Sequence, residues 1–382
     1  MFAPSDSRKH SLARVALTLL AAGGVISTLV WAGPLNPPSG AVSSTYKTLT
    51  EVEPRIAINS SNTPGDADSL YRIRQPGSYY LTGSITGVVG KHGIEIVTSG
   101  VTLDLNGFDL VGVASMGSFD GVSVTTSGLT NITVMNGSIR NWGQDGINFG
   151  TFLASYCRIE GIIATGNTRM GIDVWDKTTV SRCVTNGGSW GIHADGPCVV
   201  RDCFASNSTA SGIFLYSGGS ISNCSTTGNT DGFSLGYGTV ASNCAAYSNN
   251  KDGFTVSSGC TILNCTARYN AAHGISCESA CTIVGNTCAN NGGVTTDGAG
   301  VYVGSIDNRV EGNNCTGADY GIRVAFGGNI IIKNTCSGNT TNWNVVAGNA
   351  CLVVSATTGG AILGNSGGAS LGSTDPNANF TY

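Results

Sequence analysis

A repeat of 20 or 21 residues runs through positions 191–275 and constrains the fold more than any other feature. Its marker glycines lie at spacings of 21, 20, 21 and 21 residues: Gly191, Gly212, Gly232, Gly253 and Gly274. A set of cysteines keeps the same period: Cys183, Cys203, Cys224, Cys244 and Cys265. Two independent sets of positions that share one period over five turns predict a stacked repeat architecture.

Each repeat has room for three short strands and three turns. The first strand reads Gly-Ile-x-Val, and a later one carries an apolar residue three positions before the cysteine. Asparagines mark the corners, where we expect the left-handed backbone that this residue tolerates: Asn167, Asn207, Asn229, Asn249 and Asn270. After Cys265 the marker position becomes asparagine, at Asn286, Asn313, Asn334 and Asn365, and stacked amides can hydrogen-bond along the axis. The pattern predicts an all-β parallel β-helix of about thirteen rungs, since a regular rung takes 20–21 residues.

Several motifs also resemble a known family. Leu103–Gly107 (Leu-Asp-Leu-Asn-Gly), Val134–Ile139 (Val-Met-Asn-Gly-Ser-Ile) and the Gly-Ile/Phe rungs are similar to the right-handed parallel β-helix proteins of the pectate-lyase-like superfamily. The opening segments Gly33–Pro38 and Thr48–Arg55 resemble exported bacterial members of largely uncharacterised function. The resemblance covers roughly Thr48 to Asn365 and implies a right-handed solenoid with three strands per rung. It does not specify an activity, because this fold hosts lyases, hydrolases, epimerases, adhesins and inert scaffolds.

The chain divides into four segments by composition. Residues 1–32 read as a signal peptide, because basic residues precede an uncharged apolar run at 15–31 and Val30-Trp31-Ala32 resembles a cleavage site. The run is long enough that an uncleaved membrane anchor is the alternative. Proline-rich residues 33–78 are assigned to an N-terminal arm and cap, 79–366 to the β-helix and 367–382 to a C-terminal tail. We therefore expect a secreted, periplasmic or cell-surface protein.

The composition of the chain limits the classes of partner and cofactor that we expect. Only 11% of residues are charged and the net charge is -4 with no basic run, so we expect no nucleic-acid partner. The 14 cysteines fall mostly in sets spaced by one repeat, and their parallel Cβ vectors suit disulfides poorly. We expect mostly free, buried thiols. No Cys-x-x-Cys pair occurs and the 4 histidines do not cluster with the cysteines, so neither a metal nor a cofactor is expected.

The candidate functional residues lie at and near the x position of Gly-Ile-x-Val. We expect this position to face outward, because its apolar neighbours face inward. That position is occupied in turn by Asn148, Asp173, His193, Phe214, Ser234, Thr255, Ser276, Tyr302 and Arg323. The predicted catalytic residues are Asp173, His193 and Asp195, which gather on two adjacent rungs. The predicted substrate-binding residues around them are Trp175, Asp176, Trp190, Phe214 and Tyr216. Glu278 and Arg323 form an alternative pair on the same face.

Two carboxyls about 8 Å apart suit inverting glycoside cleavage, and His193 or Asp173 as base suits lyase-type proton abstraction. The sequence thus favours a protein that binds an extracellular polysaccharide and, if it is an enzyme, acts as a polysaccharide lyase or glycoside hydrolase. The alternative is a non-catalytic surface, matrix or adhesion protein. A groove walled by the loop before Gly171 or by the insertion near Gly292–Asp297 would favour catalysis, and a flat face would favour the scaffold.

Overall fold

The computed structural model describes residues 53–150, 152–293 and 297–353. The segments assigned to the signal peptide and the C-terminal tail lie outside these residues. Contacts between Cα atoms divide the chain at Pro54, and the unit that begins at Arg55 contains every described strand. Across the described residues there is no α-helix, and so none that could span a membrane.

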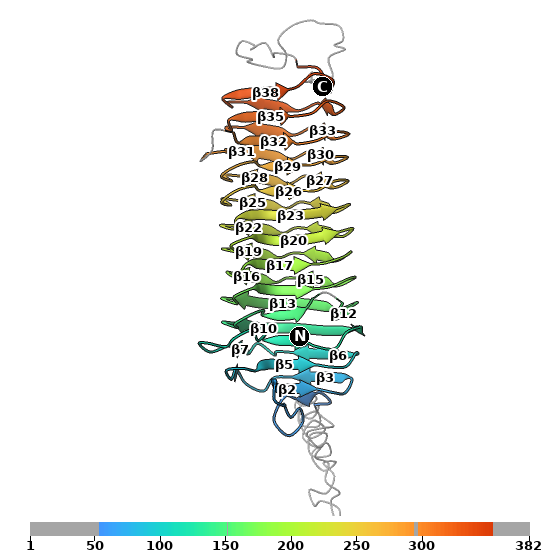
Figure 1. The fold of residues 1–382 in the computed structure, drawn as a ribbon, viewed down its shortest axis with the longest axis vertical. Helices are drawn as coiled ribbons and strands as arrows, with labels where there is room; N and C mark the ends of the chain where they lie inside the picture. Colours follow the sequence, from blue (N-terminus) through green and yellow to red (C-terminus); the bar gives the residue numbers. More distant parts are fainter. Residues whose placement is uncertain (1–52, 151, 294–296, 354–382) are drawn as a thin grey trace, which may run out of the picture. The chain divides into compact units, whose positions relative to one another are not determined.

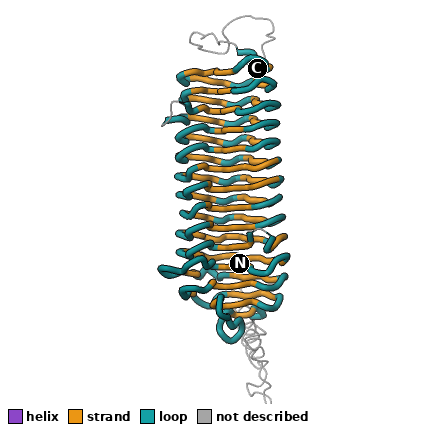
Figure 2. The backbone as a smooth tube through the Cα atoms, in the orientation of Figure 1, coloured by secondary structure: helices purple, strands orange, loops and turns teal. Residues whose placement is uncertain are grey.

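The unit is a parallel β-helix, as Figures 1 and 2 show by the regular alternation of strands and turns. One face is a 13-stranded parallel sheet, which matches the expected number of rungs. Its strands are β2 (Ser69–Ile73), β5 (His92–Ile96), β8 (Val122–Val124), β11 (Ile147–Phe149), β14 (Met170–Val174), β17 (Trp190–Ala194), β20 (Ser211–Ser217), β23 (Asp231–Tyr237), β26 (Phe254–Val256), β29 (Ile275–Cys277), β32 (Ala299–Val303), β35 (Tyr320–Val324) and β38 (Thr341–Val345).

The other two faces form a 24-stranded sheet, because the long strands β10 (Ile132–Arg140) and β13 (Arg158–Thr165) pair with strands of both. One face continues through β1 (Ile56–Ala57), β3 (Gly77–Tyr80), β6 (Val101–Asp104), β15 (Thr179–Ser181), β18 (Val199–Arg201), β21 (Ser220–Ser222), β24 (Val240–Ser242), β27 (Thr261–Leu263), β30 (Thr282–Val284), β33 (Arg309–Glu311), β36 (Ile330–Ile332) and β39 (Ala350–Cys351). The other contains β4 (Ile85–Thr86), β7 (Asp109–Val111), β16 (Val184–Asn186), β19 (Phe204–Ser206), β22 (Ser225–Thr227), β25 (Ala245–Tyr247), β28 (Thr266–Arg268), β31 (Thr287–Ala289), β34 (Asn314–Thr316) and β37 (Thr335–Ser337).

Strands begin earlier than the composition suggests. β1 and β2 already pair with β3 and β5, although both lie in residues 33–78, which the sequence assigns to the arm and cap. A separate two-stranded sheet joins β9 (Leu129–Thr130) to β12 (Ala154–Ser155), and β12 lies within the stretch that lengthens the repeat before Gly171.

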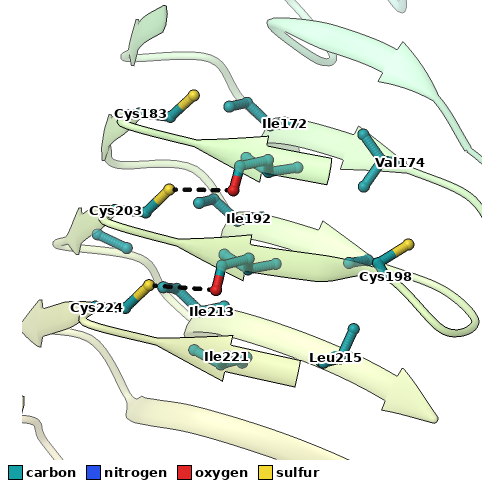
Figure 3. Packing of buried hydrophobic residues seen from close by; sticks show 14 of the residues in the cluster. Ile172, Val174, Cys183, Ile192, Cys198, Cys203, Ile213, Leu215, Ile221 and Cys224 are labelled. Carbon is teal, nitrogen blue, oxygen red and sulfur yellow. Dashed lines mark hydrogen bonds between the residues drawn. The ribbon is translucent and has the colours of Figure 1, made fainter. Parts of the chain in front are cut away.

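The core consists of identical positions stacked from rung to rung. Ile172, Ile192 and Ile213 are register partners and are fully buried. Figure 3 shows Cys183, Cys203 and Cys224 lying one above another beside this column of isoleucines. All 14 cysteines are unpaired, and all but Cys336 and Cys351 are buried, as expected for small apolar side chains.

The repeat glycines serve close packing. A Cβ built on Gly191 would lie 2.5 Å from the carbonyl oxygen of Gly212, and one on Gly232 would lie 2.5 Å from that of Gly253. Atoms at this distance overlap, so each rung can approach the next only where the side chain is absent. The regular spacing of these glycines along the chain therefore reflects close contact between neighbouring rungs.

The asparagines divide into two roles, and the expected backbone conformation is wrong for most of them. Asn207 has a positive φ of 56°, and the left-handed asparagines also include a set that comes directly before the cysteines: Asn223, Asn243 and Asn264. Asn229, Asn249 and Asn270 instead form a buried ladder, in which each side-chain amide donates to the next side-chain oxygen at 2.9–3.1 Å. Asn286, Asn313 and Asn334 form the ladder expected along the axis, at 2.9 Å per bond.

Candidate functional site

The outward positions of the 13-stranded sheet line up in register, as the sequence predicts. Asn148 lies opposite Asp173, Asp173 opposite His193, and His193 opposite Phe214. Figure 1 shows β17 and β20, which carry His193 and Phe214, as successive strands of the stack. The same register continues this row of outward residues toward the first strands of the sheet, through Ser123, Glu95 and Arg72.

His193 lies between two carboxylates. Its Nδ1 atom is 3.0 Å from Oδ1 of Asp173, and its Nε2 atom is 4.0 Å from Oδ1 of Asp195. Because a carboxylate only accepts hydrogen bonds, the Asp173 contact places the proton of the neutral ring on Nδ1. Nε2 then carries a lone pair on the side of Asp195, at a distance too long for a direct hydrogen bond.

The second carboxylate oxygen of Asp173 contacts an arginine, Arg169, that the sequence does not single out. Arg169 donates to Asp173 Oδ2 at 3.4 Å and to Asp145 Oδ1 at 2.9 Å, and its Nη2 also pairs with Asp145 Oδ2. Asp173 is only 5% exposed. A Cβ on Gly150 would lie 2.5 Å from its Oδ2 atom, so the glycine leaves room for this carboxylate. Asp173 therefore orients His193, while His193 and Asp195 are the members with more solvent access.

Asp145 lies deeper still and is fully buried. Besides Arg169, it accepts a hydrogen bond from the Met170 backbone N–H at 3.0 Å. Burial raises the pKa of Asp145 to about 7 despite the guanidinium of Arg169, and the nearby carboxylates of Asp120 and Asp173 push it in the same direction. The cluster thus contains one carboxyl group that changes charge near neutral pH.

Aromatic rings cover the His193 side of the cluster. The Phe214 ring stacks on the imidazole with 4.9 Å between centroids and 5° between planes. Trp190 meets the same imidazole edge-on at 5.7 Å, and Tyr216 lies 6.4 Å from Phe214. Tyr216 is 52% exposed, so one ring of this group presents its face to solvent.

The other two predicted binding residues have different neighbours. The Trp175 ring lies 4.8 Å from Phe152, which is exposed and comes from the stretch that lengthens the repeat before Gly171. Asp176 pairs with Lys177, whose ammonium group lies 5.2 Å from the centre of the Tyr156 ring. Phe152 and Tyr156 thus extend the aromatic surface beyond the residues expected from the sequence.

Arg169, Asp145 and Phe152 were not among the sequence-predicted site residues. A signal for Asp145 exists at the position directly before the repeat glycine, which carries a polar side chain in several rungs: His92, Asp120, Asp145, Asp231, Asp252 and His273. Side chains at this position accept backbone N–H groups of the next rung, as in Asp120 with Asp145 at 3.0 Å and Asp252 with His273 at 2.8 Å. Their common role is structural, and only Asp145 also contacts the arginine behind Asp173.

The cluster does not share the hollow that lies elsewhere on the β-helix. This hollow of about 570 Å³ is lined by residues such as Val113, Met116, Asn141 and Trp142, and its lining includes none of the three predicted catalytic residues. The insertion near Gly292–Asp297 reaches the sheet at Arg323, with which Asp297 forms an ion pair. Arg323 lies on β35, six strands from β17, so the contact of Asp297 is made away from the cluster.

Within the described ranges, no three His, Cys, Asp or Glu side chains are grouped so as to hold a metal ion. The chemical capacity of the cluster is that of an imidazole between two carboxylates, which can take up a proton and have the resulting positive charge stabilised on both sides.

The fold and the comparisons define the architectural class of the protein: a right-handed parallel β-helix. The model of the family described as "Right handed beta helix region" matches residues 176–305. No curated protein sequence matches the chain.

Solved structures share the fold at low sequence identity. The A-module of mannuronan C-5 epimerase AlgE4 from Azotobacter vinelandii is 15% identical with a TM-score of 0.53, over 74% of this chain and 91% of that one. The AlgE6 A-module of the same organism is 13% identical with a TM-score of 0.51, over 72% and 88%. The tailspike protein of E. coli bacteriophage HK620, in complex with a pentasaccharide, is 13% identical with a TM-score of 0.55, over 78% and 69%.

Proposed function

We propose that the outward face of the 13-stranded sheet around His193 binds an extracellular polysaccharide and that His193 is the acid–base residue that cleaves it. The observation that carries the proposal is the imidazole between Asp173 and Asp195, 3.0 Å and 4.0 Å away, beside an exposed aromatic ring. Tyr216 and Phe214 offer apolar ring faces on which sugar rings can stack. The cluster combines a surface for sugars with a group that moves protons.

The structural neighbours support a polysaccharide as the ligand class. The two epimerase modules act on mannuronan by their names, and the tailspike is in complex with a pentasaccharide. At 13–15% identity these proteins share the fold with this chain, so the site residues are argued from their own geometry.

The geometry favours a lyase over an inverting hydrolase. An inverting hydrolase keeps a water molecule between its two carboxyl groups, but here the imidazole of His193 lies between Asp173 and Asp195. In a lyase reaction, His193 Nε2 takes the proton from the carbon next to a uronate carboxylate. The electron pair forms a carbon–carbon double bond as the glycosidic oxygen departs, and the imidazolium returns the proton to that oxygen. Asp195 stabilises the imidazolium in between.

Export is part of the proposal. A polysaccharide outside the cell is accessible only if residues 1–32 direct the chain across a membrane, as their basic and apolar pattern predicts. Retention of the apolar run as an anchor would instead fix the same β-helix at the membrane surface.

The test is to incubate the purified chain with neutral and uronic acid polysaccharides and to measure binding, new reducing ends and the ultraviolet absorbance of unsaturated products. We expect His193→Gln and Asp195→Asn to lower scission by about 100-fold or more, the usual range for acid–base groups, with less effect on binding. Tyr216→Ala should weaken binding.

Matched controls lie on other faces of the same rungs or of the next rung. Asp202→Asn removes a half-exposed carboxylate from a neighbouring turn, and Tyr247→Ala removes a similarly exposed ring on β25. Binding without scission in the unaltered chain would exclude the lyase and leave a binding protein. Absence of binding to every polysaccharide would contradict the proposal and favour the surface or matrix scaffold.

A further inference from the structure

A second cluster of aromatic and charged side chains lies on the same face, toward the last rungs. The guanidinium of Arg323 lies over two tyrosine rings, 5.4 Å from the centre of Tyr302 and 5.2 Å from that of Tyr320. The Tyr302 ring also stacks on His273, with 4.8 Å between centroids. The two tyrosines hold the planar cation in place from β32 and β35 and leave its side chain 28% exposed.

The charge partner of Arg323 is a carboxylate that solvent can reach. Asp297, which belongs to the insertion in the repeat, pairs with Arg323 and is 60% exposed on its side chain. An exposed ion pair is worth only about 0–1 kcal/mol, so another anion can replace Asp297 at small cost. Because the guanidinium already pairs with the carboxylate of Asp297, the contact also shows that this group can bind a carboxylate.

The outward positions between the two clusters carry mostly short side chains. The register from Phe214 to Tyr302 passes through three short side chains, Ser234, Thr255 and Ser276. The next outward positions carry Gly236, Ser257, Glu278 and Gly304, of which Glu278 is the charged exception. Arg323 lies six strands beyond His193, about 29 Å along the sheet at the usual strand spacing.

We infer that Arg323, Tyr302 and Tyr320 form a second binding site for an anionic sugar unit of the same polymer that reaches His193, and that Asp297 is an internal competitor for that site. This inference rests on the proposed polysaccharide-binding function and adds a second place on the face where the charge of the polymer is recognised. A polymer that lies along the sheet contacts aromatic rings at the His193 cluster and at Arg323, and it passes over small side chains between these two clusters. The anion pairs with the guanidinium, which binds carboxylate and sulfate groups through paired N–H donors.

His273 contributes a neutral donor beside this site. Its Nδ1 atom accepts the Ala299 backbone N–H at 3.0 Å, so the ring proton lies on Nε2. Burial lowers the pKa of His273, which keeps the ring neutral under ordinary conditions. The positive charge that selects an anion therefore comes from Arg323.

The experiment compares one uronic acid polymer with its carboxyl-reduced neutral form and a sulfated polymer of similar length, by affinity electrophoresis or calorimetry. Arg323→Gln should weaken binding of the anionic polymers about tenfold, the range of one charged hydrogen-bonded contact, and leave the neutral polymer unchanged. Asp297→Asn should strengthen binding of the anionic polymers by up to about fivefold, because the competing ion pair is lost. Preference for the uronate over the sulfated polymer would assign the anion as carboxylate, and the reverse would assign sulfate.

Matched controls exist in the exposed ion pair between Arg309 and Glu311, which lies on β33 in the other sheet. Arg309→Gln and Glu311→Gln make the same charge changes away from the proposed site. Equal binding of charged and neutral polymers, or an Arg323→Gln effect no larger than that of Arg309→Gln, would overturn the inference and leave the proposed function intact. Failure of all polymers to bind would refute the proposed function itself.

Discussion

Asp173 and His193 lie directly opposite each other on β14 and β17 and share a 3.0 Å hydrogen bond between Oδ1 and Nδ1. The bond runs along the stacking axis, so it ties the outward side chains of two successive rungs together. Since Arg169 holds the second oxygen of Asp173, the orientation of the imidazole depends on a buried carboxylate and on the arginine that contacts it.

The first prediction concerns this orientation. Asp173→Asn replaces an acceptor-only carboxylate by an amide that can also donate, so His193 should lose its fixed Nδ1–H tautomer. Nitrogen-15 NMR of the imidazole reads the tautomer whether or not the protein is catalytic. If the proposed chemistry holds, scission should also fall on the order of 100-fold, mainly in kcat. An unchanged tautomer in the variant would show that Asp173 does not orient the ring, and Asp202→Asn is the control.

The second prediction follows from the raised pKa of Asp145, from 3.8 to about 7. Between these values the folded state binds the proton more tightly than the unfolded state, so the contribution of Asp145 to stability falls as pH rises through this window. Asp145→Asn keeps the oxygen that accepts the Met170 N–H but does not titrate. Relative to this variant, the wild type should lose up to about 4 kcal/mol of unfolding free energy between about pH 4 and pH 8.

Urea unfolding at a series of pH values measures this difference. Asp109→Asn, which removes a partly exposed carboxylate paired with Arg140, is the control and should track the wild type. A constant gap between wild type and Asp145→Asn at all pH values would mean that burial does not raise this pKa.

The third prediction concerns the buried asparagine ladder. Asn270 accepts from the backbone and side chain of Asn249 and donates to the Ala246 carbonyl at 3.2 Å and to Asn291 at 2.9 Å. Asn270→Ala leaves several of these partners unpaired inside the protein, so it should cost about 2–4 kcal/mol of unfolding free energy. The exposed neighbour Asn250 offers the matched change, for which we expect less than about 0.5 kcal/mol. Equal melting temperatures for the two variants would contradict the ladder's role.

The fourth prediction tests the repeat glycines. Gly232→Ala brings a methyl group to 2.5 Å from the Gly253 carbonyl oxygen and 2.6 Å from Thr226 Oγ1. The rungs must separate locally, and we expect a loss of about 1–3 kcal/mol. Gly83→Ala adds the same methyl group where no atom lies within 4 Å and should be neutral. Denaturant midpoints compare the two, and a stable Gly232→Ala variant would disprove the close-packing explanation.

The fifth prediction concerns the thiols. Burial raises the pKa of both Cys157 and Cys198 to about 11, so these groups remain protonated and unreactive at neutral pH. A thiol reagent should label the native protein only at the half-buried Cys336 and Cys351, while all 14 cysteines should react in denaturant without a reductant. Fewer than 14 reactive thiols in the unfolded, unreduced chain would reveal disulfides.

Much of the fold follows from the sequence because a solenoid converts sequence period into spatial contact. Residues one repeat apart become neighbours, so the spacing of the repeat glycines already implies that Asp173 lies opposite His193, as the register confirms. The same rule places Tyr302 opposite Arg323. Because successive side chains of a strand point to opposite faces, the buried isoleucines alternate with the outward residues.

Side-chain direction at the corners does not follow from the period. Asn249 and Asn223 belong to the same repeat pattern, yet the first is buried in a hydrogen-bonded ladder and the second has the left-handed φ. Which asparagine takes which role depends on where each corner carbonyl and N–H group points, and the one-dimensional spacing of residues carries no such information.

The sequence alone therefore determines the parallel β-helix, its rung number and the face to whose outward positions Asp173, His193 and Tyr302 belong, because each of these is a consequence of periodicity. Only the tertiary structure decides that Arg169 and Asp145 support Asp173, that Phe152 covers Trp175 and that Asp297 pairs with Arg323. Phe152 and Asp297 come from stretches that interrupt the period, whereas Asp145 keeps the period but its partner is not set by it. Their contacts arise from side-chain reach and burial in three dimensions, which no repeat spacing encodes.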